Sequence, residues 1–360
     1  MKVFIWLFLI TIVIVFMENN PSLNNLSFWN EANTYRAKII YVTTSSQSDH
    51  SALQSILALF FDGPYNGKKI FLTNIYDDHP MTILYTKGDW IFIQKKNDTN
   101  KEDFFIKGPV RDRGILILLG IFVLSLLFVG GKQGFRALLS LGVIYFLIFK
   151  MLIPLTMKGY NPIAVSIAIA IISTVLTLLI VSGFNGKTVA SIVGTIFGVL
   201  IASYLAWFFG NTIHLTGCAD QTTEILQYSA SFHVDFKGLL FAGIIVGALG
   251  AVMDMTMSIA SAIQELKISN PKLSLDSLVT QGLKVGKDII GTMTNTLILA
   301  YVGGAFSLIL LFAIHNTSFA RIINSEEVSS EIVRILAGSI GLISAVPITA
   351  FVAAITAKGE

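Results

Sequence analysis

The chain has 360 residues, of which 54% are hydrophobic and 13% are charged, and its mean hydropathy is +0.72. Soluble globular proteins carry about 25% charged residues, so the composition excludes an ordinary soluble domain and indicates a polytopic membrane protein. The formal net charge is only +3, and the single cysteine is Cys218. Such a chain gives no reason to expect nucleic acid as a partner, and it can form neither an intrachain disulfide nor a cysteine-based zinc cluster.

The N-terminus carries an apolar run, Val3–Met17, directly after Lys2. The run is short for a span, because a hydrocarbon core of about 30 Å needs about 20 helical residues. It is therefore either the hydrophobic part of a signal peptide or an uncleaved anchor. The following "ENNPSLNN" lacks a small-residue cleavage site, which favours an anchor over residues 1–17. Either a signal peptide or an anchor would place the next segment outside the cytoplasm.

Residues 18–112 are polar and predict a separate extracytoplasmic, β-rich domain. β-branched and aromatic residues gather in "YRAKIIYVTT", "KKIFLTNIY", "MTILYTK" and "DWIFIQKK", with turn sequences such as "DGPYNGKK" between them. This pattern indicates a small β-barrel or sandwich, OB-like or SH3-like. The domain is either a stabilising or docking module or a ligand-binding one. Tyr65, Tyr76 and Trp90 could stack on a ligand, although aromatic residues of strands more often belong to the core.

Seven long apolar segments follow, so that residues 113–360 are predicted to form a seven-helix transmembrane domain and the chain about eight spans. The segments are Ile115–Gly131, Ala137–Met157, Ile163–Phe184, Val189–Phe209, Leu239–Ile263, Ile289–Ile314 and Ile335–Ala357. Lysine and arginine are more frequent in the loops on the side of the N-terminus. This bias predicts that both termini are cytoplasmic and that residues 18–112 lie outside.

A weak repeat runs through the predicted membrane domain. "VGGKQGFRALLSLG" (129–142) aligns without gaps with "VSGFNGKTVASIVG" (181–194), and "SIVGT" (191–195) resembles "DIIGT" (288–292). The pattern indicates hairpin repeats of one orientation with an eighth helix appended. Gly142, Gly194 and Gly291 would lie at a similar depth, where small residues let helices approach closely. The alternative is chance, because glycine is common in membrane helices.

Asp254 stands inside the apolar segment "VGALGAVMDMTMSIASAIQEL" (246–266), about 14 Å from the inner boundary at about 1.5 Å per helical residue. A charge at the bilayer centre costs roughly 2.5–3.5 kcal/mol on insertion scales, so the side chain must face the bundle interior, a partner or water. Helical spacing places a polar stripe on one face of this segment, made of Asp254, Ser258, Ser261 and Glu265. Toward the outer side, the same face continues with the small residues Gly243, Gly247 and Gly250.

The next predicted helix carries a second polar stripe, in "KDIIGTMTNTLILAY". Its members are Asp288, Thr292, Asn295 and Thr296. A single connection joins the two segments, so we expect them to be neighbours and Asp254 to share a polar pocket with Asn295.

Two interpretations of Asp254 stay open. In the first, it binds a cation or a proton together with Ser258, Ser261, Thr292 and Asn295, because hard cations prefer oxygen ligands. In the second, it is hydrogen-bonded glue between helices, which contributes about 0.6–2 kcal/mol per contact. Glu265 and Asp288 lie near the interface, where they are either part of an inner polar motif or simply solvated or paired with lysine.

These residues carry a resemblance to a known family. "GALGAVMDMTMSIASAIQEL", then "NP", then "GKDIIGTMTNTLILAY" resemble the signature of the YibE/F family of bacterial multi-pass membrane proteins. The resemblance implies a membrane bundle and a role as a permease or as a membrane protein without an assigned activity. By resemblance, the motif residues are Asp254, Glu265, Asn270, Pro271, Asp288, Thr292 and Asn295.

An outer loop, "NTIHLTGCADQTTEILQYSASFHVDFKG", contains weak candidates for a transition-metal site. They are His214, Cys218, Asp220, His233 and Asp235. Polar loop residues are usually just solvated, and we predict no metal and no cofactor. An intramembrane peptidase would need a second buried carboxylate, which Asp288 does not supply, so we predict no enzyme.

The sequence therefore predicts an all-α polytopic bundle with a small extracytoplasmic β-domain in a bacterial cell membrane. We expect a permease-like protein that moves a small solute or ion. The alternative is a membrane scaffold or assembly protein whose outer domain docks a partner. The lipid bilayer is its environment, a small solute or cation its expected ligand, and a homo-oligomer or a paralogous membrane protein its expected partner.

Overall fold

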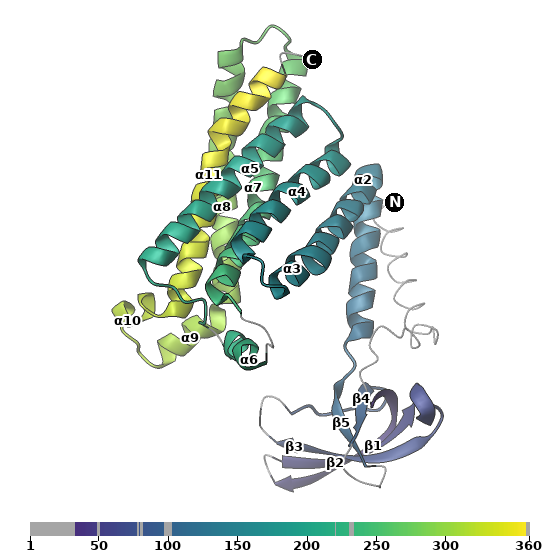
Figure 1. Cartoon of the computed structure of the whole chain (residues 1–360). Coiled ribbons are helices and arrows are strands. Elements are labelled where there is room, and N and C mark those ends of the chain that lie inside the picture. The colour runs from purple at the N-terminus through teal and green to yellow at the C-terminus, as the bar shows by residue number, and fades with distance from the viewer. Residues whose placement is uncertain are drawn as a thin grey trace. The chain divides into compact units, whose positions relative to one another are not determined.

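The computed structural model describes residues 33–48, 51–77, 79, 82–96, 103–219, 221–229 and 234–357, and these form two compact units divided at Gly131. The units, residues 1–131 and 132–360, are considered separately below (Figure 1). The predicted anchor over residues 1–17 lies outside the described residues. The predicted domain boundary at residue 112 stays a prediction.

The first unit contains a five-stranded antiparallel sheet in the order β3-β2-β1-β4-β5. Its strands are β1 (Thr34–Ser48), β2 (Ser51–Phe60), β3 (Lys69–Asp77), β4 (Trp90–Lys95) and β5 (Phe104–Pro109), with a 3-10 turn, η3 (Gly63–Tyr65), between β2 and β3. The sheet is curled, and its edge strands β3 and β5 come into contact. One face of each strand therefore points into a common core.

The interior of the curled sheet is apolar, with one buried amide at its centre. Ile39, Ile56, Ile91 and Ile93 are almost completely buried. Gln54, which is 1% exposed, satisfies its amide: Nε2 donates to the backbone oxygen of Tyr85 at 2.9 Å, and Oε1 accepts from the Tyr85 backbone N–H at 3.0 Å. A buried polar group is tolerated when it is hydrogen-bonded in this way.

The structure corrects the strand prediction in one place. The run 81–87 is irregular over the described residues 82–87, although a strand was expected there. Its backbone is held by side chains instead of by a strand ladder, because Gln54 bonds Tyr85 and the Asn74 amide donates to the Ile83 oxygen at 2.9 Å. The strands β2 and β5 fill the places that the sequence had not assigned.

The aromatic residues of the sheet belong mainly to its packing. Tyr65 packs edge-on against Tyr35, with ring centroids 5.3 Å apart, and Trp90 packs against Phe61 at 4.7 Å. Tyr65 packs against the buried core of the sheet, as expected for an aromatic residue of a strand domain. Trp90 is half-buried on the face of β4 opposite Ile91 and Ile93, so the contact with Phe61 does not place it in the core.

The first apolar helix, α2 (Asp112–Leu147), consists of two helical stretches that meet at Gly131. The backbone there has φ 53° and ψ −126°, a left-handed conformation that glycine adopts without a Cβ penalty. After Leu147 the helix continues as a π-helical turn, η4 (Ile148–Leu152), and as α3 (Ile153–Met157). Pro154 lacks the N–H that would bond to the preceding turn, which accounts for the irregular hydrogen bonding there.

The core of the second unit consists of four long apolar helices, α4 (Pro162–Ser182), α5 (Gly186–Thr212), α7 (Phe236–Ser269) and α11 (Glu326–Thr356). They confirm four of the predicted segments. The tightest pair is α5 with α11, whose backbones touch through glycine. A Cβ on Gly198 would lie 2.8 Å from the backbone oxygen of Gly341, so only glycine fits there.

The remaining helices of this unit are shorter or bent. They are α6 (Gln221–Ser229), α8 (Leu275–Gly304), α9 (Phe306–Ile314) and α10 (Phe319–Ile323). The predicted span Ile289–Ile314 is interrupted, because α8 and α9 meet at a bend of 62° around Ala305. Within the described residues, five helices are long and apolar enough to cross a membrane, or six if the bent pair forms one span. The count of eight spans stays a prediction.

The three glycines of the predicted repeat differ in their surroundings. Gly194 lies against Thr349 and Thr256, as expected for a close helix crossing. Gly142 and Gly291 have no atom of the described chain within 4 Å of a built Cβ. Close helix packing is therefore confirmed for Gly194 only, and the common depth of the three glycines stays a prediction.

Candidate functional site

Helix α7 has two faces of opposite character. One face is buried against α4, α5, α8 and α11, and it includes Val252, Met255, Thr256, Ile259 and Ile263. The other face carries the stripe that the sequence predicts, and we call it the α7 stripe. Its members Gly243, Gly247, Gly250, Asp254, Ser258 and Glu265 are exposed, and Ser261 is half-buried.

Asp254 lies in the middle of the α7 stripe with its carboxylate unpaired. Its neighbours in sequence, Met253 and Met255, are buried, which fixes Asp254 on the outward face. Within the described chain, no side chain donates a hydrogen bond to this carboxylate and no cation pairs with it. The only local contact is made by its backbone oxygen, which accepts from the Ser258 hydroxyl at 2.8 Å. The carboxylate is therefore available to a ligand.

Helix α8 carries a matching polar line, which we call the α8 stripe. Lys284, Asp288, Gly291 and Asn295 are exposed at helical spacings of four, three and four residues. Leu278, Gly282, Gly286 and Leu297 are buried on the opposite side of the helix. Thr292 and Thr296 are also exposed, and their hydroxyls donate to the backbone oxygens of Ile289 and Thr292, each at 2.9 Å.

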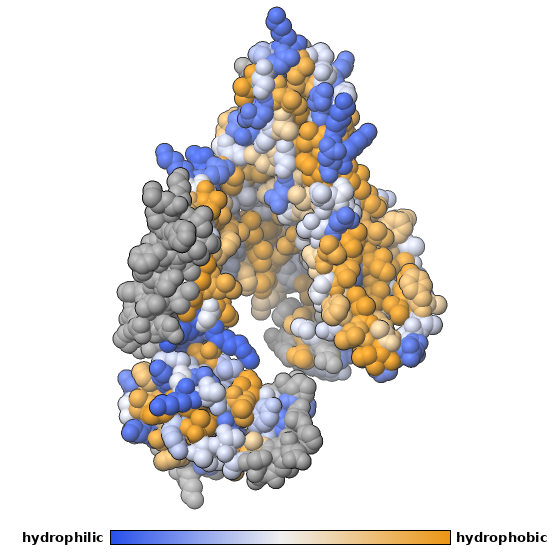
Figure 2. Space-filling model, turned by 180° about the vertical axis from the view of Figure 1, so that it is seen from behind, coloured by the Kyte–Doolittle hydropathy of each residue, from blue (hydrophilic) through white to orange (hydrophobic). Residues whose placement is uncertain are grey.

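The two helices are neighbours, as the sequence predicts, since only residues 270–274 separate them and they pack together. Gly282 lies against Ile263, and Gly286 against Ile259. Because these contacts use the buried faces, both stripes lie on the outward sides of the pair. No hydrogen bond joins the stripes among the described residues, so a pocket shared by Asp254 and Asn295 stays a prediction. In Figure 2, blue and pale residues interrupt the orange surface of the helical unit.

The inner-face motif divides into a turn and two exposed acids. The Asn270 side-chain oxygen accepts from the Lys272 backbone N–H at 3.3 Å, and the Pro271 oxygen accepts from the Lys267 ammonium at 2.7 Å. These contacts give Asn270 and Pro271 a role in shaping the turn. Glu265 and Asp288 are exposed, and neither has an ion pair within the described residues.

Sequence reasoning missed Tyr301 of α8, which lies beside the N-terminal half of the α7 stripe. Its hydroxyl lies over Gly247, 2.5 Å from a built Cβ, so Gly247 makes room for it. The Arg334 guanidinium lies 5.7 Å from the Tyr301 ring and pairs with Glu331 at 3.1 Å. The signal was present, because Tyr301 ends the motif "TNTLILAY" two residues before the pair Gly303 and Gly304.

The weak metal candidates of the outer loop are only partly described, because Asp220 and His233 lie outside the described residues. Asp235 caps α7, since its carboxylate accepts from the Gly238 backbone N–H at 2.8 Å. Cys218 is exposed and His214 sits in the turn after α5. In the part of the chain that the structure describes, no group of three His, Cys, Asp or Glu side chains could hold a metal ion.

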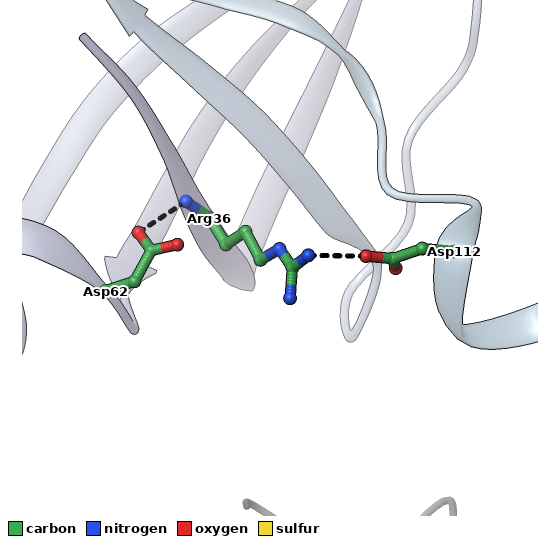
Figure 3. A network of polar contacts seen from close by, with 3 residues as sticks. All are labelled: Arg36, Asp62 and Asp112. Atoms are coloured by element: carbon green, nitrogen blue, oxygen red, sulfur yellow. Dashed lines mark hydrogen bonds and ion pairs between the residues drawn. The ribbon is translucent and has the colours of Figure 1, made fainter. Parts of the chain in front are cut away.

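A second polar cluster that the sequence did not reveal joins the sheet to the start of α2 (Figure 3). The Arg36 guanidinium pairs with Asp112 at 2.6 Å, and the Arg36 backbone N–H donates to Asp62 at 2.7 Å. Burial raises the pKa of the Asp62 carboxyl, while the hydrogen bond and the charge of Arg36 act in the lowering direction. This cluster joins strand β1 to the start of α2.

The family comparison covers the helices just described. A family model for YibE/F-like proteins matches residues 118–359, which include both stripes and the turn between them. The chain belongs to the YibE/F family. Searches of the curated proteins and of the solved structures give no match. The resemblance seen in the sequence is thus confirmed, and with its long apolar helices this YibE/F-like protein is a membrane protein.

Proposed function

We propose that this YibE/F-like protein is a permease that moves a small solute or an ion, with Asp254 as the coupling carboxylate. The observation that supports the proposal is the exposed, unpaired state of Asp254 in the middle of an apolar helix. Ionisable side chains within membrane helices face water, a ligand or a partner, because lipid exposure is costly. A carboxylate that served as helix glue would have a partner in the bundle.

The neighbouring oxygen atoms suit a cation or a proton. Ser258, Thr292 and Asn295 supply hydroxyl and amide oxygens near the level of Asp254 on the two helices, and Ser261 continues the α7 stripe about two turns further along. Hard cations prefer oxygen ligands, and a carboxylate can equally take up a proton. The broken pair α8 and α9 fits this reading, since interrupted helices recur in transporters beside the transported ion. We include no enzymatic step in this function.

The proposed setting is a bacterial cell membrane, with both termini in the cytoplasm and the sheet outside. The curled sheet then acts as a small outer barrel closed by β3 and β5, whose function is to stabilise or dock rather than to transport. The experiment for this orientation is the reaction of introduced cysteines with an impermeant reagent in whole cells. Thr43→Cys, on an exposed position of β1, should react from outside.

The function is tested by flux into proteoliposomes that contain the purified chain. Uptake is measured with Na⁺, K⁺ and Mg²⁺ gradients and with a proton gradient. We expect Asp254→Asn to lower the coupled flux by at least about a hundredfold, equivalent to about 2.7 kcal/mol, and Asp254→Glu to retain part of it. Asp276→Asn is the matched control, because Asp276 is an exposed acid in the first turn of α8 that belongs to neither stripe. Equal flux through the Asp254→Asn variant and the wild type would refute the proposed role of Asp254.

The second candidate function, a scaffold or assembly protein, is favoured by one observation on the outer sheet. Tyr41, Phe71 and Ile75 are 59%, 80% and 66% exposed, which is unusual for apolar side chains of a small sheet. On this reading, replacing Phe71 and Ile75 by serine abolishes the activity of the protein in cells, whereas Asp254→Asn has no effect. If the protein is a permease, Asp254→Asn abolishes its activity in cells and the serine variants at Phe71 and Ile75 have little effect.

A further inference from the structure

The outward sides of α7 and α8 form one continuous surface that is unlike the rest of the helical unit. Elsewhere on this unit the exposed side chains are largely apolar, such as Leu176 on α4 and Val193 on α5. Here the exposed residues are charged, hydroxylated or glycine along most of both stripes. Such a surface gains nothing from contact with lipid tails, because charges within the hydrocarbon layer are costly.

The charges on this surface are complementary between the two helices. The α7 stripe has the acids Asp254 and Glu265 and no base, whereas the exposed side of α8 has Lys284 and Lys287 beside Asp288. Within the described residues, none of these five groups forms an ion pair. The buried sides of α7 and α8 meet at Ile263 and Gly282, so the acids of α7 and the lysines of α8 lie on sides of the helices that face away from this contact.

The difference in depth between Glu265 and Lys284 is within the reach of a lysine side chain. Glu265 lies two residues from Ile263 toward the turn, and Lys284 lies two residues from Gly282 in the opposite direction along the hairpin. At about 1.5 Å per residue, the two positions differ in depth by about 6 Å. The flexible four-carbon stem of a lysine can bridge such an offset. A helix that presents Lys284 at its own depth is therefore a fitting partner for Glu265.

We propose that a second copy of this chain covers the surface, with α7 of one copy against α8 of the other and Glu265 paired with Lys284 of the second copy. A two-fold axis along the membrane normal makes this contact twice and keeps each residue at its depth, as an isologous interface requires. Gly243, Gly250 and Gly291 have no described atom within 4 Å of a built Cβ, which leaves room for the second copy's helices. The dimer shields Asp254 from lipid.

Dimerisation through this surface and transport by the chain can be tested independently. A chain that dimerises through this surface but carries no flux would remove the proposed function and leave the dimer in place. A chain that transports as a monomer would refute the dimer and leave the proposed transport function in place.

The contact is tested by cross-linking introduced cysteines in native membranes with a homobifunctional maleimide, because an offset of about 6 Å between packed helices is too large for a direct disulfide. Every chain carries Cys218→Ser. Two chains with different tags are co-expressed, one with Glu265→Cys and the other with Lys284→Cys. We expect a species of twice the chain mass that carries both tags. The control pairs Lys284→Cys with Leu176→Cys, which is on the exposed side of α4. Equal cross-linking in the control, or no species carrying both tags, overturns the proposal.

Charge reversal tests the pairing without relying on a cross-link. The dimer fraction is measured by single-molecule photobleaching of the full chain in liposomes at low density. Glu265→Lys or Lys284→Glu alone should lower the association constant by about tenfold or more, and the double reversal should restore it. Lys272→Glu, an exposed charge in the turn, is the matched control and should leave dimerisation unchanged. Single reversals without effect, or a wild type that is monomeric, contradict the proposal.

Discussion

Two helix surfaces in the second unit are rich in small and polar residues, and they behave in opposite ways. Between α5 and α11, Gly198 and Gly341 bring two backbones into contact, and the neighbouring side chains are buried. On the outward side of α7 and α8, Gly250 and Gly291 face open space, and Asp254 has no partner in the described chain. Small residues alone therefore do not distinguish a helix contact from an unoccupied surface. The distinction lies in whether the neighbouring polar groups are satisfied.

The largest expected difference between the two surfaces concerns glycine. Gly198→Leu would force side-chain atoms against the Gly341 backbone and Ala345. Overpacking costs about 1–3 kcal/mol even where side chains can move, so we expect the free energy of unfolding to fall by at least about 3 kcal/mol. Gly250→Leu is the matched change on the outward surface and should leave the unfolding temperature of the detergent-purified monomer nearly unchanged. Similar losses for both variants would mean that the outward surface is packed in the folded chain.

A smaller difference is expected for hydroxyl groups on the two faces of α7. Thr256 is fully buried, and its hydroxyl lies 2.7 Å from that of Thr195 on α5. Thr256→Val removes this hydrogen bond and leaves the Thr195 hydroxyl buried, which should cost about 1–3 kcal/mol in thermal unfolding. Ser258→Ala, on the outward face two residues further on, should cost little. A double variant with Thr195→Val should lose less than the sum of the two single changes.

The smallest expected effect is on the pH dependence of stability, and it distinguishes two aspartates in different units. Asp62 is half-buried and accepts a hydrogen bond from Arg36, whereas Asp254 is exposed and unpaired. Because burial raises the pKa of Asp62 in the folded state, the folded state holds that proton more strongly. Its contribution to stability is present at low pH and is lost as the pH rises through the unfolded and then the folded pKa.

Hydrogen exchange at β1, corrected for the intrinsic rate, measures this dependence in the full chain. Asp62→Asn keeps the oxygen that accepts from Arg36 and should make the protection of β1 less dependent on pH in the acid range. An unchanged pH dependence in Asp62→Asn would show that another group is responsible.

The four core helices could be predicted because α4, α5, α7 and α11 are long apolar runs whose length alone indicates a span. The α7 stripe could be predicted as well, since the spacing from Asp254 to Glu265 needs only helical geometry. The bend after Tyr301 could not, because "VGGAF" is equally compatible with a continuous helix. Strand β2 was missed because "SALQSILALF" lacks strict alternation, and its place depends on pairing with both β1 and β3.

The side-chain contacts of the site were beyond sequence reasoning for a different reason. The approach of Tyr301 to Gly247 and the pairing of Arg36 with Asp112 join residues far apart in the chain. No local pattern encodes either contact. The outward direction of both stripes likewise depends on which side of α8 packs against α7, and glycine at 282 and 286 decides that side.

The measurement that tests the account most directly is the water accessibility of the α7 stripe. In a chain with Cys218→Ser, Ser258→Cys and the lipid-facing control Ile172→Cys, on α4, are compared in intact membranes. Thiolates react with hydrophilic methanethiosulfonates, and thiols in lipid do not ionise. We expect Ser258→Cys to react at least about tenfold faster than Ile172→Cys, a difference of about 1.4 kcal/mol in the barrier. Equal, slow reaction at both positions would contradict a water-accessible site at Asp254.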